Sequence, residues 1–539
     1  MATERPIDLD GLTLDGVRAG VLRGRRVAVL GAARSGIGLV RFFVQAGAFV
    51  TLYDARPPDQ LAEAESAIEA LEVAHAPGLA PGSGPLVDIV AGPDVDPAVA
   101  FEGAALVATS PSINPDYPTT EPRLRAALRH LVDAHAADAT AAPALVSEAD
   151  LFLRLCPAPT IGVTGTKGKT TTSTLAAAVL AADPSHPVEL GGNIGRPLVE
   201  LLPTLGPDHR VVIELSELQL PTLSRGTTVA VYTNVTSDHL DRHGTLEAYR
   251  RVKRRLAELV DPAGALVLNA DDPTVAAYAS SARARVITYR GSAPPPGGLG
   301  IVEDWIVADG VERLAALGGG AAATGPGGRI LPVGELAIPG RHNVANAMAA
   351  TAVGLLFGVD PDAIRRAATA FTGVEHRLET VATIDGVRFV NDSQGTQPDA
   401  VIAALRAYSA PIVLIAGGRD KEIDLSALAP VVAERAAGAI LIGESGPALE
   451  RLFRSAGLER TERAATLEDA VGRADGLARA LAGAGAAGAA GGDGLATVLL
   501  SPAAASFDMF VDYAARGRAF KAAVAALAAR RAAIRGADR

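Results

Sequence analysis

A glycine-rich segment is the first part of the chain whose residue types indicate chemistry. Residues 165–171 read Gly-Thr-Lys-Gly-Lys-Thr-Thr and stand between an apolar run at 160–163 and a helical stretch at 171–181. Glycines let backbone N–H groups curl around phosphate oxygens, and the N-terminal end of the following helix adds positive charge. We therefore expect Gly165, Thr166, Lys167, Gly168, Lys169, Thr170 and Thr171 to bind the phosphates of ATP.

Within this loop, two side chains have distinct expected roles. Lys169 would reach the outer phosphates, and the Thr170 hydroxyl would contact Mg²⁺. The general phosphate-loop pattern requires glycine where Val163 stands, so the segment is a variant of that pattern. Because motors, transporters, kinases and ligases all use such loops, the loop alone names no reaction.

Charged residues follow the next two apolar runs. Glu214 ends the run at 211–213, and a carboxylate at a strand tip beside a phosphate loop is well placed to hold Mg²⁺. The run at 229–234 leads into Asp238-His239-Leu-Asp241-Arg-His. Each of these groups taken singly is typical of a solvated loop, whereas the cluster favours a functional site. Lys253, in a basic helix at 249–260, by itself predicts a solvated helix face.

Side-chain amides mark two further segments. Asn269-Ala-Asp271-Asp272 follows a short apolar run at 265–268. Asn343 and Asn346 lie three residues apart near the start of a helix, so they share a face. Two amides there would suit a nucleotide base, and an ordinary helix cap explains them equally well.

The elements that must position these residues repeat one pattern. Apolar runs at 26–30, 160–163 and 411–416 each lead into glycine, and helical stretches such as 36–45 and 362–371 alternate with runs such as 49–53. This alternation predicts an α/β fold with mostly parallel sheets covered on both faces. The glycine-rich stretches 291–298, 318–328 and 483–494 predict surface insertions.

The bulk composition limits the class of protein. A chain of 539 residues suggests about three domains, and we place them at 1–145, 146–373 and 374–539, with a linker within 133–143. A net charge of −10 does not favour nucleic acid or an anionic membrane. The single cysteine, Cys156, and the absence of a signal peptide or apolar span predict a cytoplasmic protein.

Eight motifs in order give the chain a family resemblance. They are the phosphate loop, Glu214-Leu-Ser-x-x-Gln-Leu, Asn234-Val-Thr-x-Asp-His-x-Asp-Arg, Asn269-Ala-Asp-Asp, Gly340-Arg-His-Asn-x-x-Asn, Glu375-His-Arg, Asn391-Asp-Ser and Leu500-Ser-Pro-Ala-x-Ala-Ser-x-Asp-x-Phe. This set resembles the Mur ligase family from about residue 26 to 520, and is most similar to the branch that adds D-glutamate to UDP-N-acetylmuramoyl-L-alanine.

The resemblance implies a Rossmann-like UDP-substrate domain, a central ATPase domain and a Rossmann-like C-terminal domain that brings the amino acid. It implies a monomer that acts on small molecules and uses ATP together with Mg²⁺ ions at two sites. Lys169, Glu214, His239 and Lys253 would be catalytic, and Thr170, Glu214, His239 and a carbamylated Lys253 would bind metal.

Substrate contacts are implied in the same way. The nucleotide side would include Asn343, Asn346, Arg377 and Asp392 besides the loop. The UDP-substrate side would include Arg34, Ser35, Asp54, Arg56, Ser110, Pro111, Asn193, Ser216 and Gln219. The incoming amino acid would meet Thr396, Lys421, Ser506, Phe507 and Tyr513.

One departure from the family pattern concerns the third domain. The family often has lysine where this chain has Gln394, so a cation expected near the incoming glutamate is missing. Lys421 or Arg419 would have to serve instead. A sister ligase adding another amino acid, including L-glutamate, is the nearest alternative. A folylpolyglutamate-synthase-like ligase fits less well, because it lacks the UDP-binding first domain on which this chain spends about 145 residues before the phosphate loop. A phosphate-loop protein of another class leaves the Asp238–His243 cluster without a role.

Overall fold

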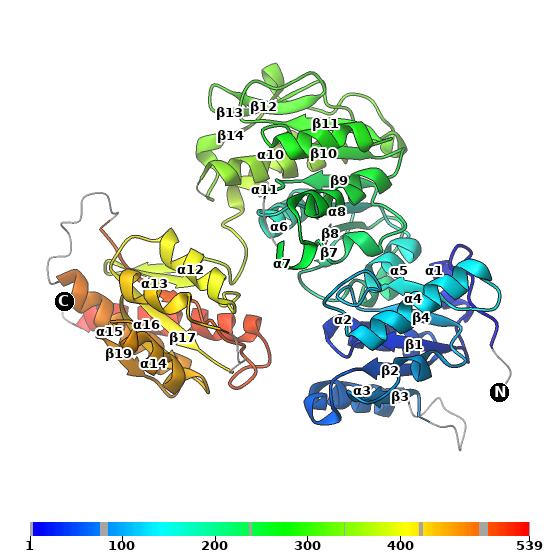
Figure 1. The fold of residues 1–539 in the computed structure, drawn as a ribbon. Coiled ribbons are helices and arrows are strands. Elements are labelled where there is room, and N and C mark those ends of the chain that lie inside the picture. The colour runs from blue at the N-terminus through cyan, green and yellow to red at the C-terminus, as the bar shows by residue number, and fades with distance from the viewer. Residues whose placement is uncertain are drawn as a thin grey trace. The chain divides into compact units, whose positions relative to one another are not determined.

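The computed structural model describes residues 4–75, 85–236, 240–338, 340–419, 424–483 and 494–537. The chain packs as two compact units, one ending at Phe371 and the other beginning at Thr372. Within the described residues the strands form three sheets, of five and nine strands in the first unit and six in the second (Figure 1). The predicted α/β class with mostly parallel sheets is confirmed, whereas the exact boundaries at 145 and 373 stay predictions.

The N-terminal sheet is parallel throughout and has the order β3-β2-β1-β4-β5, which is the doubly wound order of Rossmann folds. Its strands are β1 (Arg26–Leu30), β2 (Phe49–Asp54), β3 (Val87–Ala91), β4 (Leu106–Thr109) and β5 (Ala144–Ser147). Its helices are α1 (Leu14–Arg18), α2 (Arg34–Gln45), α3 (Ala62–His75) and α4 (Pro122–Ala137), and α5 (Glu148–Leu155) leads to the central sheet.

The linker predicted within 133–143 is wrong. Residues up to Ala137 complete α4, and the turn that follows is held by a hydrogen bond between His135 Nδ1 and the Ala142 carbonyl, 2.8 Å. The next strand, β5, pairs with β4 inside the N-terminal sheet. An alanine-rich polar stretch resembles a linker in sequence because one face of α4 is solvated, a pattern shared by surface helices.

The central sheet has the order β14-β13-β12-β11-β10-β9-β6-β8-β7, parallel except for the β12–β13–β14 meander. Its strands are β6 (Thr160–Thr164), β7 (Val188–Gly192), β8 (Arg210–Glu214), β9 (Val229–Tyr232), β10 (Ala265–Asn269), β11 (Arg285–Tyr289), β12 (Gly298–Val302), β13 (Trp305–Asp309) and β14 (Arg329–Pro332). Its helices are α6 (Lys169–Ala181), α7 (Leu240–His243), α8 (Leu246–Leu259), α9 (Pro273–Ala277), α10 (Arg341–Leu356) and α11 (Pro361–Ala370).

The sheet of the second unit has the order β15-β16-β20-β17-β18-β19, with only the β15–β16 pair antiparallel. Its strands are β15 (Glu379–Ile384), β16 (Val387–Asn391), β17 (Ile412–Gly417), β18 (Ala436–Ile442), β19 (Thr461–Arg463) and β20 (Ala496–Leu500). Its helices are α12 (Pro398–Ala407), α13 (Leu428–Arg435), α14 (Gly446–Ser455), α15 (Leu467–Gly483) and α16 (Tyr513–Ala537).

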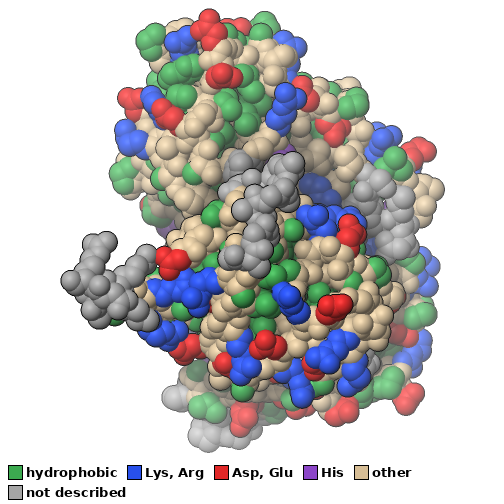
Figure 2. Space-filling view, turned by 90° about the vertical axis from the view of Figure 1, so that its left-hand side faces the viewer, with side chains coloured by type: hydrophobic (Ala, Val, Ile, Leu, Met, Phe, Trp, Pro, Cys, Tyr) green, Lys and Arg blue, Asp and Glu red, His purple; other side chains and the backbone are tan. Residues whose placement is uncertain are grey.

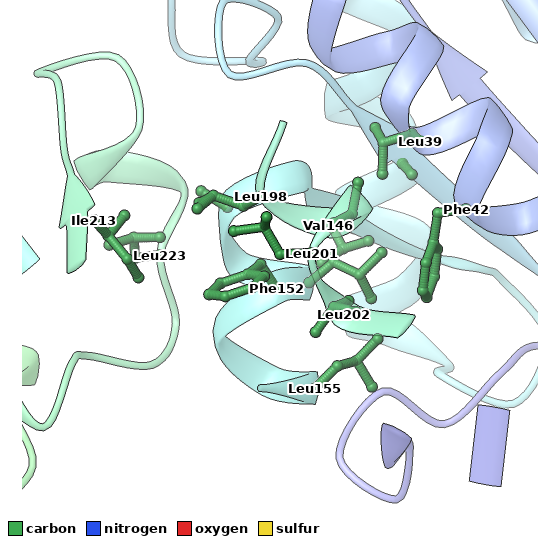
Figure 3. Close-up of a cluster of buried hydrophobic side chains, with 14 of the residues drawn as sticks. Leu39, Phe42, Val146, Phe152, Leu155, Leu198, Leu201, Leu202, Ile213 and Leu223 are labelled. Carbon is green, nitrogen blue, oxygen red and sulfur yellow. The ribbon is translucent and has the colours of Figure 1, made fainter. Parts of the chain in front are cut away.

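One hydrophobic core joins the N-terminal and central sheets. Figure 3 shows Leu39 and Phe42 of α2 near Val146 of β5 and Leu202, while Ile213 of β8 and Leu223 extend the same cluster. Phe152 and Leu155 of α5 and Leu198 and Leu201 belong to it as well. Because apolar burial is the main favourable term in folding, a shared core explains why these two sheets form one compact unit.

The surface carries both signs of charge. On the face drawn in Figure 2, Lys and Arg side chains alternate with Asp and Glu. The glycine-rich stretches 291–298 and 318–328 are mostly exposed loops beside β12 and β14, as predicted, whereas most of 483–494 lies outside the described residues. Across the part of the chain that is described, no helix combines the length and apolarity needed to cross a membrane.

Gly36 shows how backbone crowding fixes the first turn of the N-terminal domain. Helix α2 begins at Arg34, two residues before the predicted start, so Gly36 lies inside its first turn. A Cβ atom on Gly36 would overlap the carbonyl oxygen of Gly31, at the end of the preceding strand. Backbone cannot yield as a flexible side chain can, so only glycine fits at this position.

Replacing Gly36 with alanine is therefore expected to destabilise the fold. We expect Gly36→Ala to lower the free energy of unfolding by about 2–4 kcal/mol, since the methyl group forces the backbone of the turn apart. Gly472→Ala is the control, because Gly472 is exposed within α15 and an added Cβ meets nothing within 4 Å. That variant should gain about 0.5–1 kcal/mol from helix propensity. Urea unfolding measures both, and an unchanged Gly36→Ala midpoint would contradict the argument.

Candidate active site

Three parallel strands of the central sheet end side by side. Strand β6 pairs with β8 on one side, with Val163 opposite Glu214, and with β9 on the other, with Thr164 opposite Tyr232. The carboxyl ends of parallel strands meet at one edge of a sheet, where ligands of α/β proteins bind. The predicted phosphate loop, the predicted metal carboxylate and the segment after β9 are therefore neighbours.

The phosphate loop depends on two glycines for its path. Gly168 has φ of 83° and forms the N-cap of α6, so the helix begins at Lys169 and not at the predicted residue 171. A Cβ on Gly168 would lie 2.7 Å from Asn346 Oδ1, and one on Gly165 would overlap the Thr233 hydroxyl. These close approaches bring the start of α6 directly against α10 and the end of β9.

The two polar side chains at the start of α6 lie at the loop. Lys169 Nζ donates hydrogen bonds to the carbonyl oxygens of Gly165, 3.1 Å, and Thr166, 2.9 Å. Thr170 is buried in the first turn of the helix. An ammonium group held over the loop and a helix N-terminus together create a site of positive potential that suits phosphate.

Glu214 is a buried carboxylate with an unsatisfied oxygen. Its side chain ends β8 and is 1% exposed, and Oε1 accepts a hydrogen bond of 2.8 Å from Asn193 Nδ2. Oε2 has no hydrogen-bond partner among the described residues. Burying a charged oxygen without a partner is costly, and carboxylate oxygens are preferred ligands of Mg²⁺. The residue therefore fits a bound divalent cation.

The burial of Lys253 contradicts the prediction that this residue lies on a solvated helix face. Read alone, the basic helix predicted a solvated lysine, yet the Lys253 side chain is 0% exposed. Its Nζ donates to the Gly165 carbonyl, 3.0 Å, and to Thr164 Oγ1, 3.3 Å, and lies 5.6 Å from the centre of the Tyr249 ring. Helix α8 is amphipathic, so its one inward-facing lysine cannot be distinguished by composition from its outward-facing arginines.

Two predicted residues lie outside the described residues. They are His239, expected at the metal site, and Lys421, expected at the amino-acid site. Within the described residues, no group of three or more His, Cys, Asp or Glu side chains is arranged to hold a metal ion.

One of the two paired asparagines of α10, Asn346, contacts the phosphate-loop helix. Asn346 Oδ1 accepts a hydrogen bond of 3.1 Å from Thr172 Oγ1, and Asn346 Nδ2 donates to Asn343 Oδ1, also 3.1 Å. Asn346 is buried, whereas Asn343 is half-buried. The predicted shared face is confirmed by this contact, and it links the two asparagines to α6.

The N-terminal sheet places its predicted residues at the ends of β1 and β2. Asp54 accepts bonds from the Ala32 N–H, 2.8 Å, and from Arg56 Nε and Nη2, 3.0 and 2.8 Å. Burial alone would raise the pKa of Asp54, but these bonds outweigh it and lower that pKa. Ser110 is buried 3.3 Å from Ser112, hydroxyl to hydroxyl. Ser35 follows Arg34 in the first turn of α2, and Pro111 follows Ser110.

Arg34 joins the N-terminal domain to the central one. Its guanidinium donates to the carbonyl oxygens of Gly195, 3.0 Å, and Asn193, 3.4 Å. Asn193 in turn holds Glu214. Nearby, Gln219 Oε1 accepts from both the N–H and the hydroxyl of Ser216, 2.9 and 3.0 Å. The structure thus brings four residues predicted for the UDP-substrate side close to Glu214.

The second unit gathers its predicted residues after β16 and β20. Burial raises the pKa of Asp392 to about 6, although the Ser501 hydroxyl donates to it at 2.7 Å and the charge of Arg377 opposes the shift. Tyr513 packs edge-on against His376, with ring centres 6.4 Å apart. Ser506 is buried, Thr396 is half-buried and Phe507 is 53% exposed.

Sequence reasoning missed Arg516. This side chain is 1% exposed and donates to the carbonyl oxygens of Ser393, 3.0 Å, and of Ala504 and Ala505, both 3.2 Å. Burial lowers the pKa of Arg516 to about 10, so it is charged at neutral pH. It ties the segments after β16 and β20 together, and one arginine in an Ala/Arg-rich helix gives no sequence signal for this role.

Comparison with known proteins adds family evidence. Residues 163–354 match the Mur ligase middle domain, and residues 376–488 match the Mur ligase glutamate ligase domain. A relative from Symbiobacterium thermophilum, named UDP-N-acetylmuramoylalanine–D-glutamate ligase, is 39% identical over 94% of this chain and 100% of its own. Relatives of the same name from Pelotomaculum thermopropionicum and a Roseiflexus species are 36% and 37% identical, each over 93% of this chain and 98% of its own.

The matched domains contain the phosphate loop from Val163 onward, Glu214 and Lys253 in the first unit and Asp392 in the second. The resemblance carried by the eight motifs is confirmed over nearly the full length of the chain. The chain belongs to the Mur ligase family.

Proposed function

We propose that this protein is an ATP-dependent ligase that joins D-glutamate to UDP-N-acetylmuramoyl-L-alanine in peptidoglycan precursor synthesis. The observation that carries the proposal is the similarity to three D-glutamate ligases, 36–39% identical over 93–94% of this chain. The loop at the start of α6 and the buried Glu214 support the ATP-dependent half independently.

The proposed reaction has two steps. A carboxylate is a poor electrophile, so its oxygen first attacks the γ-phosphorus of ATP, the bond to the β–γ bridging oxygen breaks, and an acyl phosphate and ADP form. The amine of glutamate then attacks the acyl carbon through a tetrahedral intermediate. The bond to the phosphate oxygen breaks, the nitrogen loses a proton, and a peptide bond and inorganic phosphate remain.

The residues at the strand ends suit the first step. Two anions, the substrate carboxylate and the γ-phosphate, must approach each other, and their repulsion has to be neutralised. Lys169 supplies a positive charge at the loop, and the N-terminus of α6 supplies a dipole. Glu214 and Thr170 would hold Mg²⁺, which when bound neutralises phosphate charge. His239 would join them, and two ions would be bound.

Lys253 is proposed to act as a carbamate. A lysine ammonium cannot bind Mg²⁺, whereas a carbamate on the same nitrogen presents two oxygens. The burial of Nζ beneath Gly165 at the strand ends supports a role at the site and not at the surface. The carbamate forms when the uncharged amine attacks carbon dioxide and loses a proton.

The substrate contacts are proposed by matching family positions. Asn343, Asn346, Arg377 and Asp392 would bind the nucleotide. Arg34, Ser35, Asp54, Arg56, Ser110, Pro111, Asn193, Ser216 and Gln219 would bind the UDP-sugar. Thr396, Lys421, Ser506, Phe507 and Tyr513 would receive the incoming amino acid, with the protein acting as a monomer.

A sister activity with another amino acid is the second candidate, because of one residue. Gln394 stands where the family often has lysine, and its N–H donates to the His376 carbonyl at 3.0 Å. A neutral amide binds a carboxylate less strongly than an ammonium group does. The specificity for the incoming amino acid therefore depends on its contacts with residues other than Gln394.

An amino-acid panel tests the acceptor. With ATP, Mg²⁺ and UDP-N-acetylmuramoyl-L-alanine, we expect D-glutamate to support ADP release, and L-glutamate, L-alanine and diaminopimelate to leave it near background. Coupled measurement of ADP and of phosphate should give equal amounts of each. Faster turnover with any other amino acid would overturn the D-glutamate assignment, and ADP release without the UDP-sugar would overturn the ligase assignment.

Removing the Lys253 side chain tests the carbamate. We expect Lys253→Ala to lower kcat by about 100-fold or more, because metal-ligand losses have effects of this order. Acetate should restore part of the rate by lending oxygens to the metal, and chloride at equal ionic strength should not. Arg254→Ala is the matched control, since Arg254 is an adjacent surface residue paired with Glu258. Full activity of Lys253→Ala, or no rescue by acetate, would contradict the carbamate.

Neutralising Glu214 tests the metal contact. Glu214→Gln keeps an oxygen for Asn193 but removes the charge, so we expect the Mg²⁺ concentration for half-maximal rate to rise about 10- to 100-fold. Glu258→Gln, which neutralises a surface acid on α8, should leave this concentration unchanged. A magnesium titration of initial rates measures both, and identical curves for Glu214→Gln and the wild type would remove Glu214 from the metal site.

A further inference from the structure

The middle of the phosphate loop is held by the residue two positions after β9. Asn234 Oδ1 accepts a hydrogen bond of 3.0 Å from the Lys167 N–H, and Asn234 Nδ2 donates one of 3.0 Å to the Lys167 carbonyl. The Asn234 carbonyl also accepts from the Thr166 N–H at 2.7 Å. One residue thus binds both sides of Lys167 in the way that neighbouring strands bind each other.

The hydrogen bonds to Asn234 determine which backbone N–H groups of the phosphate loop can face a ligand. In a simple phosphate loop, successive N–H groups all point toward phosphate oxygens. Here the N–H groups of Thr166 and Lys167 point toward Asn234. The Thr233 hydroxyl adds a bond of 2.6 Å to the Lys167 carbonyl. The conformation of the loop before Gly168 is therefore set by the segment after β9.

A second layer holds that segment in place. Asn269 Nδ2 donates to the Thr233 carbonyl at 2.8 Å, and Asp272 Oδ2 accepts from the Val235 N–H at 2.8 Å. Asp272 Oδ1 caps α9 through the N–H groups of Thr274 and Val275. The Asn-Ala-Asp-Asp motif begins at the last residue of β10. Its contacts lead from β10 to the segment after β9, and no contact with the loop itself is needed for its effect.

We propose that Asn234 is a positioning residue of the phosphate loop, and that Asn269 and Asp272 act through it to set nucleotide affinity. The inference rests on the proposed use of ATP. It gives a role to a motif for which the reaction chemistry has none, and it places a determinant of nucleotide affinity on a strand end that does not carry the loop.

Two neighbouring carboxylates offer a matched test. Asp272→Asn can keep the oxygen that caps α9 but loses the acceptor for Val235. Asp271→Asn removes the same charge one residue away, where Asp271 Oδ2 accepts instead from the Gly291 N–H at 2.7 Å. Removing a negative charge near bound phosphates strengthens binding by itself. Weaker binding in Asp272→Asn alone therefore reports the lost hydrogen bond.

The measurement is calorimetric binding of Mg-ADP to the full chain without the UDP-sugar or amino acid. We expect Asp272→Asn and Asn234→Ala each to raise the dissociation constant about tenfold, the order expected for a lost buried hydrogen bond. Asp271→Asn should stay within about twofold of the wild type, since it leaves the segment after β9 untouched. In steady-state assays, Asp272→Asn and Asn234→Ala should each raise the KM for ATP and leave the KM for the UDP-sugar unchanged.

Amide exchange provides a readout that general destabilisation does not mimic. In Asn234→Ala, the Lys167 N–H should exchange faster, while the β6 amides keep their protection. Asn234 is half-buried, so this variant remains available if Asp272→Asn does not fold. Unchanged Mg-ADP binding in Asn234→Ala would overturn this inference and leave the proposed function standing. Binding weakened as much in Asp271→Asn as in Asp272→Asn would do the same. A wild-type protein that binds no Mg-ADP would overturn the proposed function as well.

Discussion

The parallel pairing of β6 with β8 and β9 is the constraint on which the candidate active site depends. The registers set Val163 against Glu214 and Thr164 against Tyr232. Lys169 follows β6 by five residues, Glu214 is the last residue of β8, and Asn234 follows β9 by two residues. A slip of one residue along β8 would turn Glu214 to the opposite face of the sheet, because side chains alternate along a strand. All three strands are near-continuously apolar, as expected for parallel strands that are covered on both faces.

The same edge of the sheet buries polar groups that a fold selected for stability alone would avoid. Lys253 lies beneath the loop, and Glu214 keeps one oxygen without a partner among the described residues. A buried carboxylate oxygen without a partner costs about several kcal/mol, and such groups concentrate where chemistry requires them. By contrast Arg516 is buried with its donors bonded to carbonyls, which is typical of a residue that organises a domain.

Much of this architecture could be predicted because strong local patterns report it. The apolar runs located β1, β6, β8 and β17 to within a residue or two, and the glycine-rich loop located the start of α6. The apolar run predicts the end of β9 at residue 234, whereas β9 ends at Tyr232, because Thr233 and Asn234 leave the sheet to bind the loop. That choice is made by tertiary hydrogen bonds, which residue type alone does not encode.

The residues of the candidate site also fall into two groups, those that a local sequence pattern predicts and those whose position depends on tertiary contacts. Glu214 was identifiable because a carboxylate ended an apolar strand, whereas the burial of Lys253 depends on which face of α8 meets the sheet. The contact of Asn346 with Thr172 joins residues 174 positions apart, and no local pattern reveals it. The stretch before β5 read as a linker because alanine-rich helices and alanine-rich linkers share a composition. The roles of Gln394 and Arg516 required the surroundings of each side chain.

The central claim is that the protein activates a carboxylate by phosphoryl transfer before the amine arrives, and isotope transfer tests it most directly. UDP-N-acetylmuramoyl-L-alanine with both carboxylate oxygens labelled as ¹⁸O would be converted with ATP, Mg²⁺ and D-glutamate, and the released phosphate analysed by mass spectrometry. Because the acyl C–O bond breaks when the amine displaces phosphate, the account predicts one ¹⁸O atom in each phosphate formed. Product formed with unlabelled phosphate would contradict it.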